Sequence, residues 1–172
     1  IFAHQSPGDT LALNWDGAAT RAMAPKAHGR VVWFSLRERP DGDGAYLDGE
    51  TLRLRWQGAD TAIMPRSAIR LMGEHNVANV LAACAGTAAT GIAPRAMATA
   101  VADFNGVEHR LEWVRTLDGV DYYNDSIATT PERVAAGLRC FDRPIVLLLG
   151  GRHKYLPLEP LTAEMQRHCR AT

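Results

Sequence analysis

Two stretches of the chain decide its predicted fold: residues 119–131, GVDYYNDSIATTP, and residues 144–154, PIVLLLGGRHK. The first begins with a short run typical of a β-strand and continues into a polar loop. Thr130 followed by Pro131 is a suitable helix start, because the N–H that proline lacks is not needed at the first helical position. Residues 145–149 are continuously apolar, which is typical of a strand covered on both faces of a parallel sheet. The order strand, helix, strand predicts a right-handed crossover that brings the carboxyl ends of both strands to one edge.

The two loops at that edge are rich in polar side chains. They contain an acid, two hydroxyls and three basic groups: Asp125, Ser126, Thr129, Arg152, His153 and Lys154. In open α/β sheets ligands bind at the carboxyl edge of the strands. The sequence therefore predicts a site for an anionic ligand that carries hydroxyl groups.

The first 72 residues are predicted to be mostly β. Strands are expected near residues 11–15 and 30–36, and the pair Asp48-Gly49 between two β-rich runs predicts a hairpin. In the second arm of that hairpin the apolar residues alternate with arginines. Arg53, Arg55 and Arg66 could form a phosphate-binding patch, but a solvated strand face is the favoured interpretation.

From residue 73 the pattern becomes helical. A helix is expected from residue 74 to 90, with an apolar stripe and Gly91 at its end. The stripe consists of Val77, Val80, Leu81, Cys84 and Ala88. Pro94 opens a second helix that runs to residue 102, and Phe104 is expected to anchor its end.

The turn signal Asn105-Gly106 predicts a domain boundary. Beyond it, residues 109–124 are expected to form a hairpin about Asp118-Gly119, and a last helix is expected from residue 158 to 169. The hairpin side chains expected to enter the core are Leu111, Trp113, Val120 and Tyr122.

Composition narrows the class of protein. The 172 residues carry 19 basic and 19 acidic side chains, so charge gives no reason to expect nucleic acid or an acidic membrane as partner. There is no apolar run near 18 residues and no leader sequence, so we expect a cytoplasmic protein without a membrane span. The three cysteines have no metal-ligand spacing, and Cys84 and Cys140 are expected to be reduced and buried. Because the chain begins at Ile1 and ends within a helical pattern, we expect an internal piece of something longer.

Four short motifs occur in a fixed order along the chain. They are Gly73-x-His75-Asn76-x-x-Asn79, His109-Arg110, Asn124-Asp125-Ser126-x-Ala128-Thr129 and Gly150-Gly151-x-x-Lys154. Together they resemble the ATP-dependent Mur ligase family. The form Asn-Asp-Ser-x-Ala-Thr resembles the members that add D-glutamate to a peptidoglycan precursor. The resemblance covers roughly residues 8–172 and is specific from residue 73 onward.

The resemblance implies roles for seven residues. Asn79 matches an amide that contacts the adenine of ATP, Asn76 its neighbour in the motif, Arg110 an arginine near the phosphates, and Asp125 an acid that holds the ribose hydroxyls. Substrate contacts are implied for Ser126, Thr129 and Lys154. An amide can meet the donor and the acceptor of an adenine edge, and a lysine can pair with the carboxylates of D-glutamate.

The chain also departs from the family pattern. Ile127 stands where many such enzymes have lysine, and no Gly-x-x-x-x-Gly-Lys-Ser/Thr loop occurs, since the only lysines are Lys26 and Lys154. The resemblance implies that the phosphate loop, the Mg²⁺ ligands and a modified lysine lie upstream of residue 1. No catalytic residue and no metal ligand are therefore expected within the chain, and alone it is expected to be inactive.

The resemblance implies an α/β fold in two parts. Residues 1–106 are expected to be the end of a central ATP-binding α/β domain, and residues 107–172 the first half of a Rossmann-like C-terminal domain. The implied activity is ATP-dependent addition of D-glutamate to UDP-N-acetylmuramoyl-L-alanine through an acyl phosphate, with ATP and Mg²⁺ as cofactors. Two alternatives stay open: another amino-acid ligase of the superfamily, such as a folylpolyglutamate synthetase, and a nucleotide-binding module without catalysis. The Asn-Asp-Ser-x-Ala-Thr loop argues against the first.

Overall fold

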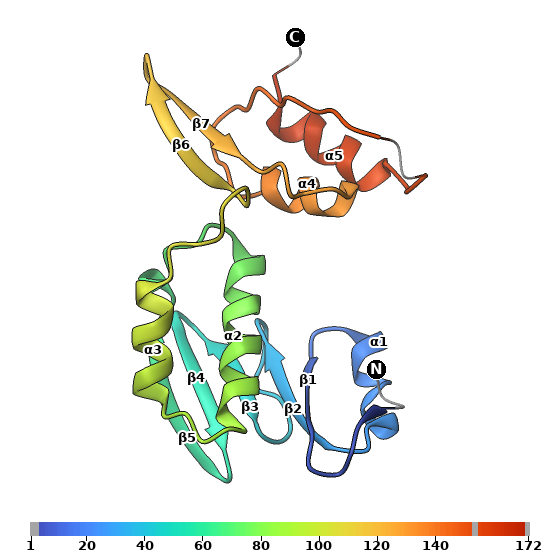
Figure 1. Cartoon of the computed structure of the whole chain (residues 1–172), viewed down its shortest axis with the longest axis vertical. Coiled ribbons are helices and arrows are strands. Elements are labelled where there is room, and N and C mark those ends of the chain that lie inside the picture. The colour runs from blue at the N-terminus through green and yellow to red at the C-terminus, as the bar shows by residue number, and fades with distance from the viewer. Residues whose placement is uncertain (1–3, 153–154, 171–172) are drawn as a thin grey trace. The chain divides into compact units, whose positions relative to one another are not determined.

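The computed structural model describes residues 4–152 and 155–170. The chain divides into two compact units. The first unit consists of Ile1–Arg70 and His75–Phe104, and the second of Leu71–Glu74 and Asn105–Thr172. Figure 1 labels their helices and strands.

The first unit is built on a mixed five-stranded sheet with the strand order β1-β2-β3-β4-β5. The strands are β1 (Thr10–Asn14), β2 (Arg30–Ser35), β3 (Gly44–Asp48), β4 (Thr51–Trp56) and β5 (Ala59–Pro65). The pairs β1–β2 and β2–β3 are parallel, whereas β3, β4 and β5 are antiparallel. Asp48 pairs with Thr51 across the β3–β4 turn, which confirms the predicted hairpin. The short helices α1 (Ala18–Arg21), η2 (Ala24–Lys26) and η3 (Arg66–Ala68) lie in the connections.

Two helices pack on this sheet (Figure 1): α2 (Glu74–Ala88) and α3 (Pro94–Asp103). All five residues of the predicted apolar stripe of α2 are buried, so that prediction is confirmed. They share one core with Val32, Leu52 and Leu54 of the sheet. Fully burying a leucine side chain contributes roughly 1.5–3 kcal/mol, so this core holds the first unit together.

The sequence correctly predicts the end of α2 but not the anchoring of α3. Gly91 has φ of +80°, and its N–H donates to the Ala88 carbonyl, as predicted for a helix end. Phe104 does not anchor α3, because its side chain is 47% exposed. The buried residue of α3 is Met97, which lies in the core of the first unit.

The second unit begins with the predicted hairpin, formed by β6 (Glu112–Leu117) and β7 (Val120–Asn124). Asp118 and Gly119 form its turn with φ of +49° and +77°, the left-handed pair that a two-residue hairpin turn requires. Of the four side chains expected in the core, Leu111 is half-buried, but the prediction is wrong for the other three. Trp113 is 57% exposed, and Val120 and Tyr122 are also exposed, because the described part of the second unit places no second layer over both faces of the ribbon.

Two helices, α4 (Pro131–Leu138) and α5 (Glu159–His168), follow as predicted. Thr130 is the N-cap residue of α4 and Pro131 is the first residue of the helix, as predicted. The Thr130 side chain makes no capping hydrogen bond. Ala135 and Leu138 of α4 and Leu161 of α5 are buried.

The predicted buried strand at residues 145–149 is wrong for the described chain. Only Ile145 pairs, in a single parallel bridge with Cys169, and Leu148 is 93% exposed. A central parallel strand needs a ladder of partners on both sides, and the described residues supply hydrogen bonds only at Ile145. The second unit therefore contains β7, α4 and the start of a crossover, without a parallel sheet in its described part.

None of the described helices is both long enough and apolar enough to cross a membrane.

Candidate functional site

The seven predicted site residues fall into three groups. Asn76 and Asn79 lie on α2 in the first unit, whereas four residues lie in the second unit: Arg110, Asp125, Ser126 and Thr129. Lys154, like His153, lies outside the described residues. The structure therefore does not test whether these residues meet the loop that contains Asp125.

Asn76 and Asn79 occupy the first two turns of α2. Their spacing of three residues puts them on one face, and Asn79 Nδ2 donates to Asn76 Oδ1 at 3.3 Å. Asn76 is buried, whereas Asn79 is exposed. The inner amide thus orients the outer one, which keeps a carbonyl oxygen and a second N–H available for a ligand.

The four predicted residues of the second unit belong to two segments at the open end of the β6–β7 hairpin. We call these segments, residues 107–112 and 124–129, the hairpin base. Leu111 N–H donates to Asp125 Oδ1 at 3.1 Å, and Ile127 N–H donates to the His109 carbonyl at 3.2 Å. These two bonds flank Arg110, so the structure brings the segments of Arg110 and Asp125 together, as a shared site requires.

Asp125 is the most enclosed of these four residues. It is half-buried, and a Cβ built on Gly137 of α4 would lie 3.1 Å from its Oδ2. The absence of a side chain at Gly137 therefore lets the carboxylate lie against the helix. Burial raises the pKa of the Cys140 thiol, and the negative charge of Asp125 raises it further. Because a carboxylate has about four lone-pair positions, Asp125 can still accept hydrogen bonds from a ligand.

Ser126 and Thr129 are exposed in the loop between β7 and α4. Ala128 N–H donates to the Asp125 carbonyl at 2.9 Å, and Thr129 N–H donates to the Ile127 carbonyl at the same distance. These backbone bonds fold the loop tightly without using either hydroxyl. Both hydroxyls are therefore placed at the surface of the hairpin base, where a ligand can reach them.

Three further residues of the hairpin base received no role from the sequence: His109, Glu112 and Asn124. Asn124 Nδ2 lies 2.8 Å from His109 Nδ1, and His109 N–H donates to Glu112 Oε2 at 2.7 Å. The sequence shows these residue types but not their contact, because Asn124 and His109 are 15 residues apart. The only local signal was the spacing of three between His109 and Glu112.

Two of the three arginines considered for a phosphate-binding patch, Arg53 and Arg66, lie beside acidic side chains. Arg53 Nε bonds Asp60 Oδ1 at 2.9 Å, and Tyr46 donates its hydroxyl to Asp60 Oδ2 at 2.6 Å. The Tyr46 hydrogen bond, with the Arg53 guanidinium, lowers the pKa of Asp60. Arg66 lies 3.8 Å from Glu50. These pairs fit the favoured interpretation of a solvated strand face.

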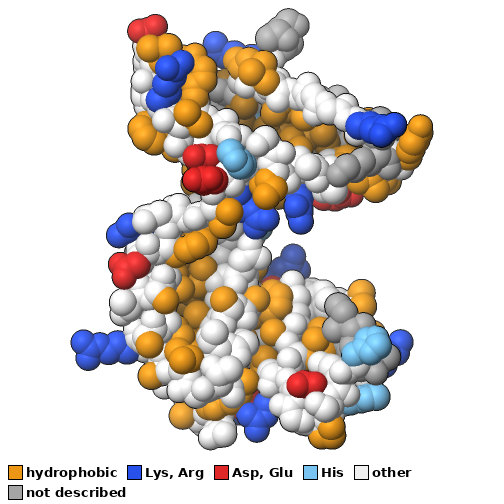
Figure 2. Space-filling view, viewed as in Figure 1, with side chains coloured by type: hydrophobic (Ala, Val, Ile, Leu, Met, Phe, Trp, Pro, Cys, Tyr) orange, Lys and Arg blue, Asp and Glu red, His pale blue; other side chains and the backbone are white. Residues whose placement is uncertain are grey.

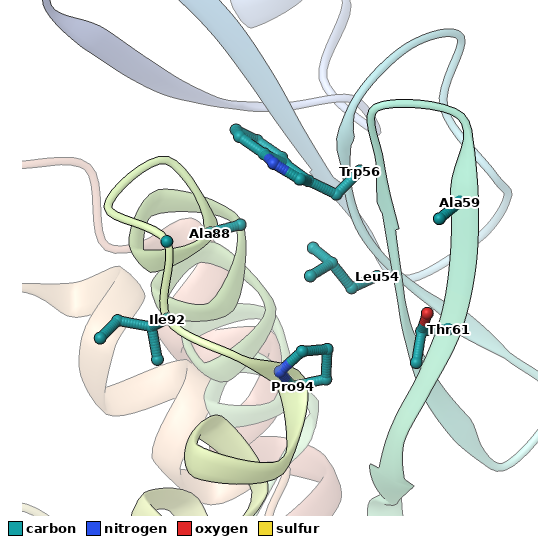
Figure 3. A pocket seen from close by; sticks show the side chains of 8 residues that line it. Leu54, Trp56, Ala59, Thr61, Ala88, Ile92 and Pro94 are labelled. Atoms are coloured by element: carbon teal, nitrogen blue, oxygen red, sulfur yellow. The ribbon is translucent and has the colours of Figure 1, made fainter.

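An apolar pocket of about 230 Å³ lies in the first unit, and its lining includes none of the predicted site residues. Figure 3 shows it between β4, β5, the end of α2 and the start of α3. Its lining consists of Leu54, Trp56, Ala59, Thr61, Ala88, Gly91, Ile92 and Pro94. Apart from the Thr61 hydroxyl and the Trp56 indole N–H these side chains are apolar, and none of them carries a charge that could pair with phosphates or carboxylates. Within residues 4–152 and 155–170, no group of three or more His, Cys, Asp and Glu side chains could hold a metal ion.

Comparison with known proteins points to one enzyme. No protein-family profile matches the chain. The UDP-N-acetylmuramoylalanine–D-glutamate ligase of Roseiflexus sp. (strain RS-1) is 44% identical over 99% of this chain. The corresponding ligases of Clostridium novyi (strain NT) and Symbiobacterium thermophilum are 44% and 46% identical over 95% and 94% of it. The chain spans only 38%, 34% and 36% of the lengths of these three relatives.

Solved structures agree at the level of the fold. The UDP-N-acetylmuramoylalanyl-D-glutamyl-2,6-diaminopimelate–D-alanyl-D-alanyl ligase of Acinetobacter baumannii matches 81% of this chain and 31% of its own, with a TM-score of 0.62 and 17% identity. A UDP-N-acetylmuramoyl-L-alanyl-D-glutamate–2,6-diaminopimelate ligase matches 93% of this chain and 35% of its own, with a TM-score of 0.53 and 21% identity. The α/β fold is thus that of a part of these ligases. By sequence the chain is homologous, over nearly its whole length, to about a third of the UDP-N-acetylmuramoylalanine–D-glutamate ligases.

Proposed function

We propose that this chain is part of a cytoplasmic, ATP-dependent ligase that adds D-glutamate to UDP-N-acetylmuramoyl-L-alanine in peptidoglycan precursor synthesis. The observation that carries the proposal is 44–46% identity to such ligases over 94–99% of the chain. In this reaction ATP phosphorylates the precursor's terminal carboxylate, the amine of D-glutamate attacks the acyl phosphate, and phosphate leaves. Such chemistry depends mainly on positioning and charge stabilisation.

The chain's own part in this reaction is to orient ATP. Asn79, oriented by Asn76, would contact the adenine, Arg110 the phosphates, and Asp125 the ribose hydroxyls. The geometry of Asp125 supports its role, because one oxygen is fixed by the Leu111 N–H while the carboxylate keeps free acceptor positions. Arg110 is exposed beside it in the hairpin base, as a phosphate contact has to be.

D-Glutamate would be held by Ser126, Thr129 and Lys154. Both hydroxyls lie at the surface of the loop that Asp125 begins, so one loop would face both ATP and the amino acid. Because Ile127 replaces a cation that many such enzymes have there, Lys154 would supply most of the charge for the D-glutamate carboxylates. The phosphate loop and the ligands of Mg²⁺, the second cofactor, would come from parts of the ligase outside this chain.

The two units would correspond to the end of the central ATP-binding domain, residues 1–106, and to part of a Rossmann-like C-terminal domain, residues 107–172. The exposed apolar run at residues 146–149 supports this assignment for the second unit. Val146, Leu148 and Leu149 have the composition of a central parallel strand, and the bridge from Ile145 to Cys169 is parallel. Further strands beside this run would complete the sheet.

The test is an assay of a complete ligase that contains this segment. It should incorporate labelled D-glutamate into UDP-N-acetylmuramoyl-L-alanine and release one phosphate per ATP, and omission of ATP or replacement of D-glutamate by L-glutamate should abolish incorporation. Transfer of glutamate to a folate acceptor would favour a folylpolyglutamate synthetase. Nucleotide binding without any turnover would favour a non-catalytic module. The 172-residue chain alone should show no activity.

A further inference from the structure

Hydrogen bonds link three residues of the hairpin base, His109, Glu112 and Asn124, and the donor and the acceptor of each bond can be assigned. Asn124 lies between Ser126 and His109, and His109 lies between Asn124 and Glu112. His109 is in the left-handed backbone region, with φ of +66°, which is unusual for a residue with a side chain. A strained residue that has contacts within its own segment and with the opposite segment is a candidate for a positioning role.

The amide of Asn124 can be oriented from its neighbours. Ser126 N–H donates to Asn124 Oδ1 at 3.1 Å, so the other end of the amide, Nδ2, faces His109 Nδ1 at 2.8 Å. An amide nitrogen can only donate, and Nδ1 must therefore be the acceptor. The ring of His109 is then neutral and carries its proton on Nε2.

Glu112 holds the backbone of the same histidine. Its Oε2 accepts the His109 backbone N–H at 2.7 Å and lies 3.6 Å from Nδ1. A carboxylate cannot donate to an unprotonated nitrogen, so Glu112 holds the backbone of His109 while Asn124 holds its ring. The two partners therefore restrain both the unusual φ and the direction of the side chain.

The contacts of His109 affect the position of Arg110. It lies between His109 and Leu111, both left-handed, with φ of +66° and +45°. The His109 carbonyl accepts the Ile127 N–H and the Leu111 N–H donates to Asp125, so both neighbours of Arg110 are tied to the opposite segment. The ring contact of His109 with Asn124 adds a side-chain link between the same two segments, so its loss would loosen the register of Arg110 and Asp125.

We propose that His109, whose Nε2–H tautomer is set by Asn124 and whose backbone is held by Glu112, is the positioning residue that keeps Arg110 and Asp125 in register for ATP. The part concerning ATP rests on the proposed function, whereas the tautomer and the contacts do not. His109 acts through Arg110 and Asp125 and itself touches no reacting atom.

The first experiment determines the tautomer in the ¹⁵N-labelled 172-residue chain. In a long-range ¹H–¹⁵N spectrum His109, assigned by its loss in His109→Asn, should show a pyridine-like Nδ1 and a pyrrole-like Nε2. Asn124→Asp has nearly the same shape but removes the donor that faces Nδ1, so it should move the proton to Nδ1 or produce the doubly protonated ring. A pyrrole-like Nδ1 in the wild type, averaged tautomers, or no change in Asn124→Asp would overturn the proposal.

The second experiment measures the ATP contribution in a complete ligase containing this segment. His109→Ala should raise the KM for ATP roughly threefold to tenfold, as expected for the loss of the ring hydrogen bond to Asn124, with a smaller effect on the KM for D-glutamate. His109→Asn should restore most of the affinity, because its Oδ1 can accept from Asn124 near the position of Nδ1. Equal effects of the Ala and Asn variants, or equal effects on both substrates, would refute the positioning role. If the complete wild-type ligase does not use D-glutamate, the proposed function fails while the spectroscopic result still decides the tautomer.

Discussion

The two units of the chain differ in how completely their apolar residues are covered. In the first unit the five-stranded sheet and two helices enclose a single core in which Val32, Leu52 and Leu81 have no exposed surface. In the second unit the helices bury a few residues, while large apolar side chains of the hairpin and of residues 146–149 remain at the surface. Figure 2 shows such side chains over the β6–β7 hairpin. The first unit therefore has most of its packing partners within the described chain, whereas the second unit does not.

The largest expected difference between the units comes from making the same type of substitution, leucine to alanine, in both of them. Leu81→Ala removes a fully buried side chain and should lower the free energy of unfolding of the first unit by about 2–5 kcal/mol. Leu148→Ala removes a side chain that is almost fully exposed and should change the second unit by less than about 0.5 kcal/mol. Urea titration followed by amide NMR signals of each unit separates the two effects. A large loss from Leu148→Ala would mean that the second unit covers this residue in solution.

A second comparison lies within the second unit, between the hairpin base and the exposed hairpin. In a complete ligase, Asp125→Ala should raise the KM for ATP about tenfold or more, because hydrogen bonds to a charged group contribute roughly 1.5–3 kcal/mol. Asp121→Ala is the control, since its carboxylate accepts the Thr116 hydroxyl in the exposed ribbon, outside the hairpin base. It should leave the KM for ATP unchanged. Similar KM values for both variants would remove Asp125 from the ATP site.

The sequence was a good guide where structure depends on neighbours along the chain. The stripe of α2 and the turn at Asp118-Gly119 are set by local spacing and by glycine's access to positive φ, and both were predicted. The strand at residues 145–149 was predicted but is not formed in the structure, because an apolar run becomes a buried strand only if other strands pair with it. β5 was missed for the opposite reason, since its first four residues are exposed and carry no apolar alternation.

For the site, the sequence identified residues but not their connections. Asn76 and Asn79 share a face because the helical period requires it. The close approach of Asp125 to Gly137 and the bond from Asn124 to His109 depend on how the hairpin base folds onto itself and α4. No local pattern encodes such contacts, so His109 gained its proposed role only from the structure.

Two Gly→Ala substitutions, one in each unit, are expected to change stability in opposite directions and by smaller amounts. Gly119→Ala places a side chain at φ of +77° in the β6–β7 turn and should destabilise the second unit by roughly 1–2 kcal/mol. Gly86→Ala lies inside α2, where an added Cβ meets no atom within 4 Å, and should stabilise the first unit by about 0.5–1 kcal/mol. The same NMR-detected urea titration measures both. A destabilising Gly86→Ala would show that α2 is packed more tightly there than the structure indicates.

The smallest expected effect concerns the ion pairs of Glu164 in the second unit, of which the one with Arg139 joins α5 to the end of α4. The buried Glu164 carboxylate accepts from Arg139 Nε at 2.9 Å and Arg167 Nη1 at 3.3 Å, and His168 Nε2 lies 3.4 Å away. The Arg139 hydrogen bond, helped by these positive charges, holds the pKa of Glu164 below its ordinary value.

A carboxyl group whose pKa is lowered by folding contributes stability above its unfolded pKa, and this contribution is lost as the pH falls through the folded pKa. Acidification below the ordinary glutamate pKa should therefore weaken the second unit, and Glu164→Gln should flatten that dependence while lowering stability at neutral pH. The change should be modest, because both arginines are more than half exposed and salt screens them. Unfolding of the second unit, followed by its amide signals between pH 3 and 7, measures the two slopes. Equal slopes in the wild type and Glu164→Gln would show that these ion pairs do not couple α4 to α5.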